Sequence, residues 1–408
     1  MSAMKVLFVS PHYPDEMQGF VRGLAEVGAT VYAVGDVPEQ QLPGHVRRYL
    51  SGYMQVHDLF DEHALARQVV PIAGRLGLDR IEALWEPVVL GAARLREELG
   101  VPGMSMETAI GFRDKAVMKE RLVAAGLRVP HFARVTTAAA LREAAERIGY
   151  PLIVKPIDGA GTRDTYKLDG EADLEAVLPR LGHLPDVNVE EFIEGDEFTY
   201  DAVSIDGVPV FDSVAQYHPK PLEARSQEWI SPMQIVFRDP HVPELAAGVA
   251  LGRDVLKALG MGTGFTHMEW YRKPGGEVVF GEIAARAPGG RLVDQMNYAN
   301  DFDVYREWAR TVCWRSFDAT PHRRYHVATI FKRAQGQGRI VGMTGLDAVR
   351  ARCGSSLVLV DLLPVGAPRR DWRSTLLSDG VVTLRHPDYA ECKAMAWAVV
   401  NDLRLYAG

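Results

Sequence analysis

The stretch Gly264-Phe-Thr-His-Met-Glu-Trp-Tyr-Arg-Lys273, followed by Pro274-Gly-Gly276 and then Glu277-Val-Val-Phe-Gly-Glu-Ile-Ala284, decides the fold. Each flank is rich in β-branched and aromatic residues, and the Pro-Gly-Gly between them is typical of a turn. The segment therefore predicts a β-hairpin.

A two-residue Gly275-Gly276 loop would pair Pro274 with Glu277 and set Glu269 directly opposite Glu282. Side chains alternate between the faces of a strand, so one face is expected to carry polar groups and the other to face a core. The polar face would hold His267, Glu269, Glu282 and Arg286, and the core face Met268, Trp270, Val279 and Ile283. A three-residue loop would instead place the two glutamates on opposite faces.

The opposed glutamates predict a metal site. Like charges directly opposite each other on a ladder are destabilising, and a divalent cation between them removes the repulsion. Oxygen ligands favour Mg²⁺ over Zn²⁺. Arg286 lies about 13 Å further along an extended strand at about 3.3 Å per residue, within reach of an anionic group beyond the metal. The alternatives are a solvated hairpin face and a surface arginine.

Composition narrows the class of protein. The chain has 408 residues, a net charge of −7 and three cysteines. This length favours two or three domains, and the charge gives no basic footprint for nucleic acid or an anionic membrane. The sparse cysteines favour a reducing compartment, and no run approaches the roughly 20 apolar residues of a membrane span. We therefore expect a cytoplasmic protein with small-molecule partners, with a homodimer left open.

Three regions differ in pattern. Residues 1–110 alternate strands and helices, which predicts a Rossmann-like parallel α/β domain, although the loop after the first strand lacks the GxGxxG fingerprint. Residues 111–312 combine a helix expected over 112–125, a subdomain at about 125–195, and largely antiparallel strands up to the hairpin. Residues 313–408 are expected to form a small β-rich domain closed by a helix. The overall class is α/β, with an α+β core.

Motifs upstream of the hairpin carry a family resemblance. They are Asp114-Lys115, Tyr150-Pro-Leu-Ile-Val-Lys155-Pro156, Asp158-Gly-Ala-Gly-Thr-Arg163 and Glu190-Glu-Phe-Ile-Glu-Gly-Asp-Glu197. In this order before the glutamate hairpin, the chain resembles the ATP-grasp superfamily over roughly residues 1–312, and within it the carboxylate–amine ligases that join amino acids. The resemblance implies an ATP-grasp fold whose subdomain at about 125–195 is a mobile lid. A lone strand-end lysine or Gly-x-Gly would be only a solvated charge or a turn.

The resemblance implies a set of site residues. The expected ATP contacts are Lys115, Lys155, Gly159, Gly161, Thr162, Glu190, Phe192, Ile193 and Glu197, with the backbone near Glu190–Ile193 at the adenine and Glu197 at the ribose. The expected Mg²⁺ ligands are Glu269 and Glu282, for two ions that Mn²⁺ could replace. The expected substrate contacts are His267, Arg286, Gly289, Gly290 and Arg291, with Arg286 and Lys155 also catalytic. A packed role for His267 is the alternative.

One residue departs from the family pattern. Many members carry a metal-binding asparagine two residues after the second glutamate, where this chain has Ala284. That puts a third side-chain ligand in doubt. The Glu282-Ile-Ala-Ala-Arg286 form nevertheless looks like the bacilysin-type dipeptide ligases.

The implied activity is an ATP-dependent carboxylate–amine ligation that forms an amide or peptide bond through an acyl phosphate. A biotin-carboxylase-type enzyme that makes carboxyphosphate is one alternative. A catalytically idle nucleotide-binding regulatory protein is another. A Rossmann-type oxidoreductase is disfavoured by the missing glycine fingerprint, and the absence of GxxxxGK[ST] disfavours a P-loop NTPase.

Overall fold

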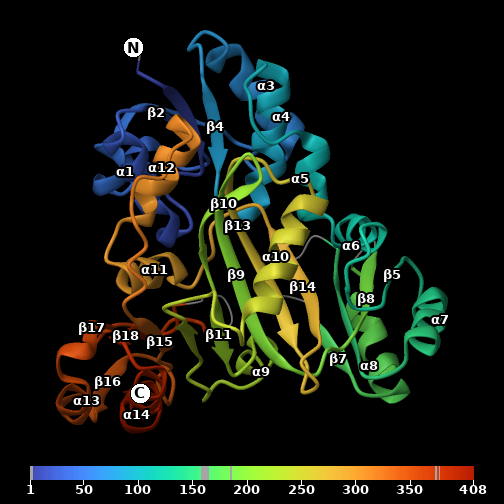
Figure 1. Cartoon of the computed structure of the whole chain (residues 1–408), viewed down its shortest axis with the longest axis vertical. Helices are drawn as coiled ribbons and strands as arrows, with labels where there is room; N and C mark the ends of the chain where they lie inside the picture. Colours follow the sequence, from blue (N-terminus) through green and yellow to red (C-terminus); the bar gives the residue numbers. More distant parts are fainter. Residues whose placement is uncertain (1–2, 158–164, 184–185, 373–374, 376) are drawn as a thin grey trace.

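The computed structural model describes residues 3–157, 165–183, 186–372, 375 and 377–408 (Figure 1). The predicted phosphate-loop residues Gly159, Gly161 and Thr162 lie outside these ranges. No helix in the described part of the chain is long and apolar enough to cross a membrane.

A parallel sheet forms the N-terminal region, as the alternating pattern predicted. Its strand order is β3-β2-β1-β4, and all three neighbouring pairs are parallel. Helices α3 and α4 pack against each other, and the sheet core is aliphatic because both faces are covered. The elements are β1 Lys5–Val9, α1 Gln18–Glu26, β2 Thr30–Gly35, α2 Gly44–Arg47, β3 Leu50–Gln55, α3 Glu62–Ala73, β4 Arg80–Ala83 and α4 Val89–Leu99.

The helix expected over 112–125 is divided in two. Asp114 takes an extended conformation and accepts hydrogen bonds from Ala116 N and Val117 N, so it ends α5 and caps α6. An aspartate side chain in this position satisfies backbone N–H groups that have no partner within the helix. Lys115 thereby becomes the first residue of α6. The two helices are α5 Met106–Arg113 and α6 Lys115–Ala124.

A second, four-stranded antiparallel sheet follows, in the order β5-β8-β6-β7. Helices α7 and α8 pack on it around a compact aliphatic core. This unit stands to one side of the larger sheet (Figure 1). Its elements are β5 Phe132–Val135, α7 Ala138–Ile148, β6 Leu152–Pro156, β7 Tyr166–Leu168, α8 Glu171–Leu181 and β8 Val187–Glu191.

A nine-stranded sheet runs through the centre of the molecule. Its path is β14-β13-β9-β11-β12-β15-β18-β17, with β10 paired to β9. Helix α10 lies close to it through two glycines: a Cβ on Gly248 would come within 2.2 Å of Trp270, and one on Gly252 within 2.3 Å of Tyr200. The elements up to the hairpin are β9 Asp196–Ile205, β10 Val208–Ser213, β11 Ala215–His218, α9 Pro221–Ala224, β12 Met233–Val236, α10 Ala246–Ala258, β13 Gly264–Arg272 and β14 Val278–Ala284.

The C-terminal region shares this central sheet. Strand β15 pairs with β12 from Met233↔Ile330 to Val236↔Val327, so the ladder continues past residue 313. Helix α12 packs on α1 of the N-terminal region, where Trp308 and Tyr305 meet Phe20. The remaining elements are α11 Leu292–Asn300, α12 Val304–Trp314, β15 His326–Phe331, β16 Ile340–Thr344, α13 Leu346–Cys353, β17 Leu357–Leu362, β18 Gly380–His386, α14 Tyr389–Asp402 and β19 Arg404–Ala407.

The hairpin corrects one prediction and confirms another. The loop has three residues, because Lys273 N donates to Glu277 O at 2.9 Å and Arg272 pairs with Val278. The predicted Pro274–Glu277 pair is therefore wrong. Glu269 nevertheless lies opposite Glu282, and His267 opposite Ala284, because the register shifts between Glu269 and Trp270. A β-bulge supplies this extra residue.

Gly281 is the residue that makes the bulge possible. A Cβ at this position would lie 2.8 Å from Glu269 O and 3.0 Å from the Tyr271 ring. Below the bulge Phe280 pairs with Trp270, and Val279 pairs with Tyr271. Phe280 therefore joins the apolar core with Trp270, and the prediction that Val279 lies on that core face is wrong.

Candidate functional site

The site is built on one face of three neighbouring strands. In the β9–β13 ladder, Asp201 is opposite His267, Thr199 is opposite Glu269, and Glu197 is opposite Tyr271. Residues that pair directly or lie two apart in a strand share a face. Strand β14 adds Glu282 beside Glu269. The sheet thus gathers three glutamates, an aspartate and a histidine on one surface.

Lysines from α6 and β6 meet this acidic surface. Lys115 Nζ lies 3.0 Å from Glu282 Oε1, and Lys155 Nζ lies 3.6 Å from Glu282 Oε2. Lys155 also pairs with Glu190 Oε2 at 3.1 Å. The structure therefore brings both predicted lysines to the hairpin glutamate, although they are 40 residues apart in the sequence and belong to different elements.

Lys119 is a third buried lysine, and the sequence reasoning assigned it no role. Its Nζ donates to Glu190 Oε1 at 2.6 Å, and its side chain is fully buried. Burial lowers the pKa of Lys119 to about 8, while the charge of Glu190 opposes that shift. The pKa of Glu190 is lowered, because Lys119 and Lys155 outweigh the effect of its burial. One helical turn separates Lys119 from Lys115, so an i, i+4 spacing could have indicated a shared face.

The two hairpin glutamates differ sharply in their electrostatics. Burial alone would raise the pKa of Glu282, but Lys115 and Lys155 lower it to about 2. Burial and the charge of Glu282 raise the pKa of Glu269, partly opposed by His267. Burial and the charge of Glu269 likewise raise the pKa of Glu197 well above its usual value. The negative charge of Glu282 is therefore offset by neighbouring lysines, whereas the negative charges of Glu269 and Glu197 are not fully offset.

His267 is neither free nor merely packed. Its Nδ1 lies 2.5 Å from Asp201 Oδ1, and its Nε2 lies 3.9 Å from Glu269 Oε1. Asp201 is fully buried and accepts a second hydrogen bond from Thr199 Oγ1 at 2.7 Å. A carboxylate on one ring nitrogen fixes the orientation of the imidazole and leaves the other nitrogen toward the site. Asp201 was missed because its relation to His267 depends on strand pairing.

Arg286 lies beyond the end of β14, so strand alternation does not set its direction as predicted. Its Nε and Nη2 both donate to Glu86 Oε2, at 3.1 and 3.0 Å. Arg113 Nη1 donates to the other oxygen of Glu86 at 2.8 Å. Glu86 is buried and lies three residues after Ala83, the last residue of β4 in the N-terminal sheet. It therefore connects the N-terminal region to the predicted catalytic arginine.

Glu86 was missed by the sequence reasoning. It is 200 residues from Arg286, so no local pattern links the two. The one available signal was its position: ligands of parallel α/β sheets bind outside the carboxyl ends of the strands, and Glu86 follows such an end.

The predicted adenine segment emerges from the middle of the second sheet. Glu190 pairs with both Phe132 and Ile153, and its side chain turns toward the lysines. Beyond the strand, the Phe192 ring lies between two lysines, with Lys167 Nζ at 4.7 Å and Lys220 Nζ at 5.1 Å from its centroid. Ile193 is buried. An aromatic and an aliphatic side chain beside cationic groups suit a flat base with an attached phosphate chain.

The predicted substrate-loop residues hold three regions together. Gly290 N donates to Glu16 of the N-terminal region at 3.3 Å, and Gly290 O accepts from Gln234 of β12. Arg291 adopts a left-handed conformation and pairs with Asp294 at 3.3 Å and with Asp361 of β17 at 3.2 Å. Leu292 N closes the turn on Gly289 O. The Arg291 guanidinium is thus engaged by acids from two elements.

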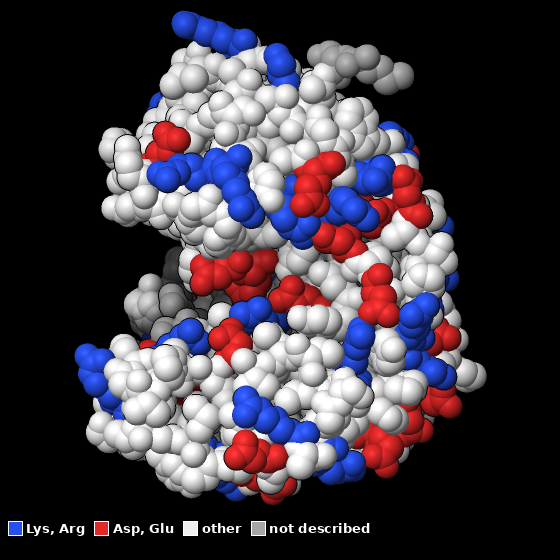
Figure 2. All heavy atoms as spheres, turned by 90° about the vertical axis from the view of Figure 1, so that its left-hand side faces the viewer, with Lys and Arg blue, Asp and Glu red and all other residues white. Residues whose placement is uncertain are grey.

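The outer surface is hollowed beside these regions. Figure 2 shows a deep hollow between the N-terminal elements above and the C-terminal elements below, with acidic side chains gathered on its inner wall. Such a concave surface is the usual setting for small-molecule binding.

The residues present fit Mg²⁺ held jointly with phosphate oxygens. Over the ranges that the structure describes, no group of three or more His, Cys, Asp or Glu side chains is arranged to hold a metal by itself. Mg²⁺ is usually bound through one or two carboxylates together with phosphates and water. The register pair Glu269–Glu282 supplies such a set, and Ala284 adds no ligand.

Comparison with known proteins gives the class. The family model described as "ATP-grasp domain" matches residues 120–289. A crystal structure of L-amino acid ligase from Bacillus licheniformis superposes with a TM-score of 0.80 over 99% of both chains, at 20% identity. Residues 120–289 therefore match an ATP-grasp domain, and the fold of the chain is the ATP-grasp fold.

Curated relatives narrow the comparison. The L-arginine-specific L-amino acid ligase of Bacillus subtilis is 32% identical over 221 residues, which cover 52% of this chain and 52% of that protein. The D-alanine–D-alanine ligase of Ralstonia pickettii is 32% identical over 151 residues, or 36% of this chain and 42% of that protein. The chain thus spans about half the length of the first relative and less than half the length of the second.

Proposed function

We propose that this protein is an ATP-dependent carboxylate–amine ligase with an amino acid as one substrate. The observation that carries the proposal is the pairing of Glu269 with Glu282 on a face that also receives Lys115 and Lys155, within an ATP-grasp domain. The names of the L-amino acid ligase relatives support an amino acid as the substrate class.

The reaction would have two steps. A substrate carboxylate takes the γ-phosphoryl group of ATP, which gives an acyl phosphate and ADP. The amine of the second substrate then attacks the acyl carbon and expels inorganic phosphate, and the proton that the amine loses passes to the released phosphate or to solvent. Mg²⁺, when bound, neutralises phosphate charge during the transfer.

The chain's own residues would position and stabilise these groups. Glu269 and Glu282 would hold the metal, and Lys115 and Lys155 would move from Glu282 to phosphate oxygens. Arg286, oriented by Glu86, would donate hydrogen bonds to the acyl phosphate and to the oxyanion of the tetrahedral intermediate. His267, oriented by Asp201, would contact a polar group of the substrate.

The remaining site assignments are also part of this proposal. Glu197 would hold the ribose, and the backbone near Phe192 and Ile193 the adenine. Gly289, Gly290 and Arg291 would shape the substrate side. Two Mg²⁺ ions, replaceable by Mn²⁺, match the two carboxylates. A homodimer is the assembly we would test by light scattering. Three free, buried cysteines favour the reducing cytoplasm.

The test is a panel of L-amino acid pairs with ATP and Mg²⁺, read as phosphate release and product mass. We expect one phosphate per amide formed. Glu282→Gln should lower turnover at least about 100-fold, the effect of removing one preorganised electrostatic group. Glu277→Gln is the matched control, because Glu277 lies in the same hairpin, is exposed, and forms surface ion pairs with Lys273 and Arg128.

Other outcomes would favour the alternatives. Phosphate release that requires bicarbonate and no amine would favour a carboxylase. ATP binding without ADP formation against every pair would favour a regulatory protein. Full activity of Glu282→Gln would contradict the metal assignment.

A further inference from the structure

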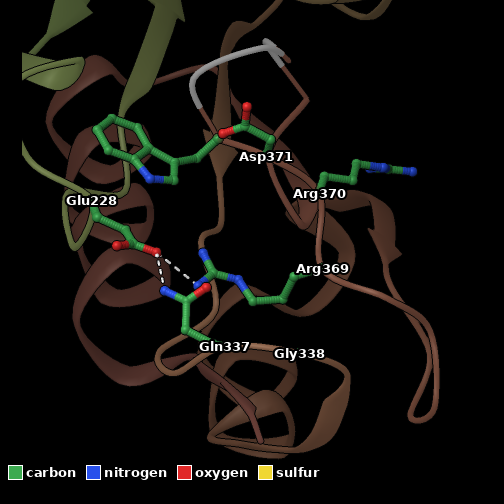
Figure 3. A pocket seen from close by; sticks show the side chains of 7 residues that line it. Glu228, Gln337, Gly338, Arg369, Arg370 and Asp371 are labelled. Carbon is green, nitrogen blue, oxygen red and sulfur yellow. Dashed lines mark hydrogen bonds and ion pairs between the residues drawn. The ribbon is translucent and has the colours of Figure 1, made fainter.

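A second cavity lies in the C-terminal region, formed by residues other than those of the glutamate site. Its volume is about 360 Å³. Glu228, from the segment between α9 and β12, forms one side, and Gln337, Arg369, Asp371 and Trp372 form the others (Figure 3). This volume is within the range of small-molecule pockets.

Arg369 points into this cavity with one hydrogen-bonding group unused. Its side chain is only 7% exposed, and its Nε and Nη1 donate to Asp379 at 3.2 Å and Glu228 at 2.8 Å. Its buried Nη2 has no hydrogen-bond partner within the described residues. Figure 3 shows the guanidinium group beside Glu228 and below Asp371. A buried donor without a partner is unfavourable, so an acceptor is expected there.

Contacts with Arg333 hold the Trp372 side of the cavity. Trp372 is 6% exposed, and the Arg333 guanidinium lies 4.6 Å from its ring centroid. Arg333 Nη1 also donates to Ala224 O at 2.8 Å and Gln227 O at 2.9 Å, which ties the segment bearing Glu228 to the C-terminal region. Arg333 thus contacts both the indole of Trp372 and the segment that bears Glu228.

The charges that line the cavity select the ligand. Among the described residues that line the cavity, Glu228 and Asp371 carry negative charges, and Arg369 and Arg370 carry positive charges. The Arg370 side chain extends away from the centre and donates to Ser378 O at 3.1 Å. A polyanion would gain little from this balance, whereas a molecule with one charge of each sign would meet an opposite charge at each end.

We propose that this cavity binds a free α-amino acid or dipeptide as its zwitterion. The ligand carboxylate accepts from Arg369 Nη2, its ammonium group faces the acidic rim formed by Glu228 and Asp371, and its side chain lies against Trp372. The site is separate from the Glu269–Glu282 pair, so it goes beyond the proposed function.

Hydrogen–deuterium exchange of the full chain tests the proposal, with L-alanyl-L-alanine as the probe. Ligand binding should slow exchange in peptides that cover residues 333–340 and 366–372. N-acetyl-alanine amide, which lacks both charges, should give no protection there. Because the readout is local, it is independent of amino-acid binding at the glutamate site and of any ligase activity.

Two variants and one control decide the outcome. Glu228→Gln keeps an acceptor for Arg369 but removes the charge, and Arg369→Gln removes the free donor; each should weaken the apparent affinity at least about tenfold. Arg350→Gln is the control, because Arg350 is 58% exposed on α13. If Arg369→Gln fails to fold, Glu228→Gln alone decides. Absence of protection in the wild type, unchanged affinity in Glu228→Gln, or equal protection by acetate would overturn the proposal.

Discussion

The two sides of the glutamate site differ in charge balance rather than in burial. Glu282 and Glu269 are similarly accessible, with 26% and 31% of their side chains exposed. Yet three lysines form ion pairs with Glu282 and Glu190, whereas the pKa values of Glu269 and Glu197 are raised because burial and neighbouring carboxylates outweigh the nearby positive charges. We call these the compensated side and the uncompensated side. A bound cation would relieve repulsion mainly on the uncompensated side, so that side is organised for function more than for stability.

The largest loss of stability is expected when the ion pairs of the compensated side are removed. Glu190→Gln removes the anion shared by Lys119 and Lys155, and leaves the fully buried Lys119 without its partner. Removing one partner of a buried ion pair typically costs about 3–5 kcal/mol. We expect the free energy of unfolding, measured by urea denaturation, to fall by an amount in this range.

The matched variant lies on the uncompensated side. Glu269→Gln removes a carboxylate whose charged form is disfavoured by burial and by Glu282. The free energy of unfolding should change by less than about 1 kcal/mol or increase, since a repulsive cross-strand pair is worth up to about 1 kcal/mol. An equal loss of stability in both variants would remove the distinction between the two sides.

The next effect concerns Arg286, which lies beyond both sides. Glu86→Gln keeps the size of the side chain but loses the charge that holds Arg286 and Arg113. We expect kcat to fall about 10- to 100-fold, because misplacement of a preorganised group by about 1 Å costs up to about 100-fold. ATP binding, measured by titration calorimetry, should remain within about threefold of wild type. A change in ATP affinity with normal kcat would refute the positioning role.

A smaller loss of stability is expected from a change at Gly281, the glycine of the β-bulge that sets the register of the hairpin. Gly281→Ala would push a Cβ against Glu269 O and the Tyr271 ring. Overpacking of this kind costs about 1–3 kcal/mol. Thermal unfolding should show the loss, and activity should fall because the bulge brings Glu269 and Glu282 onto one face. Gly275→Ala in the loop, where a Cβ meets no atom within 4 Å, is the control.

The last effect is a pH dependence of stability that arises from Lys119. Its folded-state pKa is lowered by burial to about 8, below the usual 10.5. Between these values the unfolded chain binds more protons, so the free energy of unfolding should rise with pH from about 8 to 10.5, by at most about 1.4 kcal/mol per pH unit. Lys119→Met should flatten this rise, whereas Lys257→Met, at an exposed lysine, should not. A profile unchanged by Lys119→Met would contradict the shift.

The sequence predicted the parts of the site that depend on local pattern. Strand alternation and glycine spacing placed Glu269 opposite Glu282, although the loop has one residue more than expected and Gly281 restores the pairing. A bulge could not be foreseen, because a glycine within a strand has several uses. The lysine motif came from resemblance. The partners Glu86 and Asp201 depend on contacts across 200 and 66 residues, which no single-sequence period encodes.

The unbroken ladder from β12 to β15 has a practical consequence for recombination between relatives. The four residue pairs from Met233↔Ile330 to Val236↔Val327 join the hairpin side of the sheet to the last eighty residues. A chimera that exchanges the chain after residue 312 would pair β12 of one parent with β15 of the other, so the side chains of both strands would have to match. A crossover point is better placed in loops that leave β12 and β15 on the same parental sequence, since an edge mismatch would expose unpaired backbone groups.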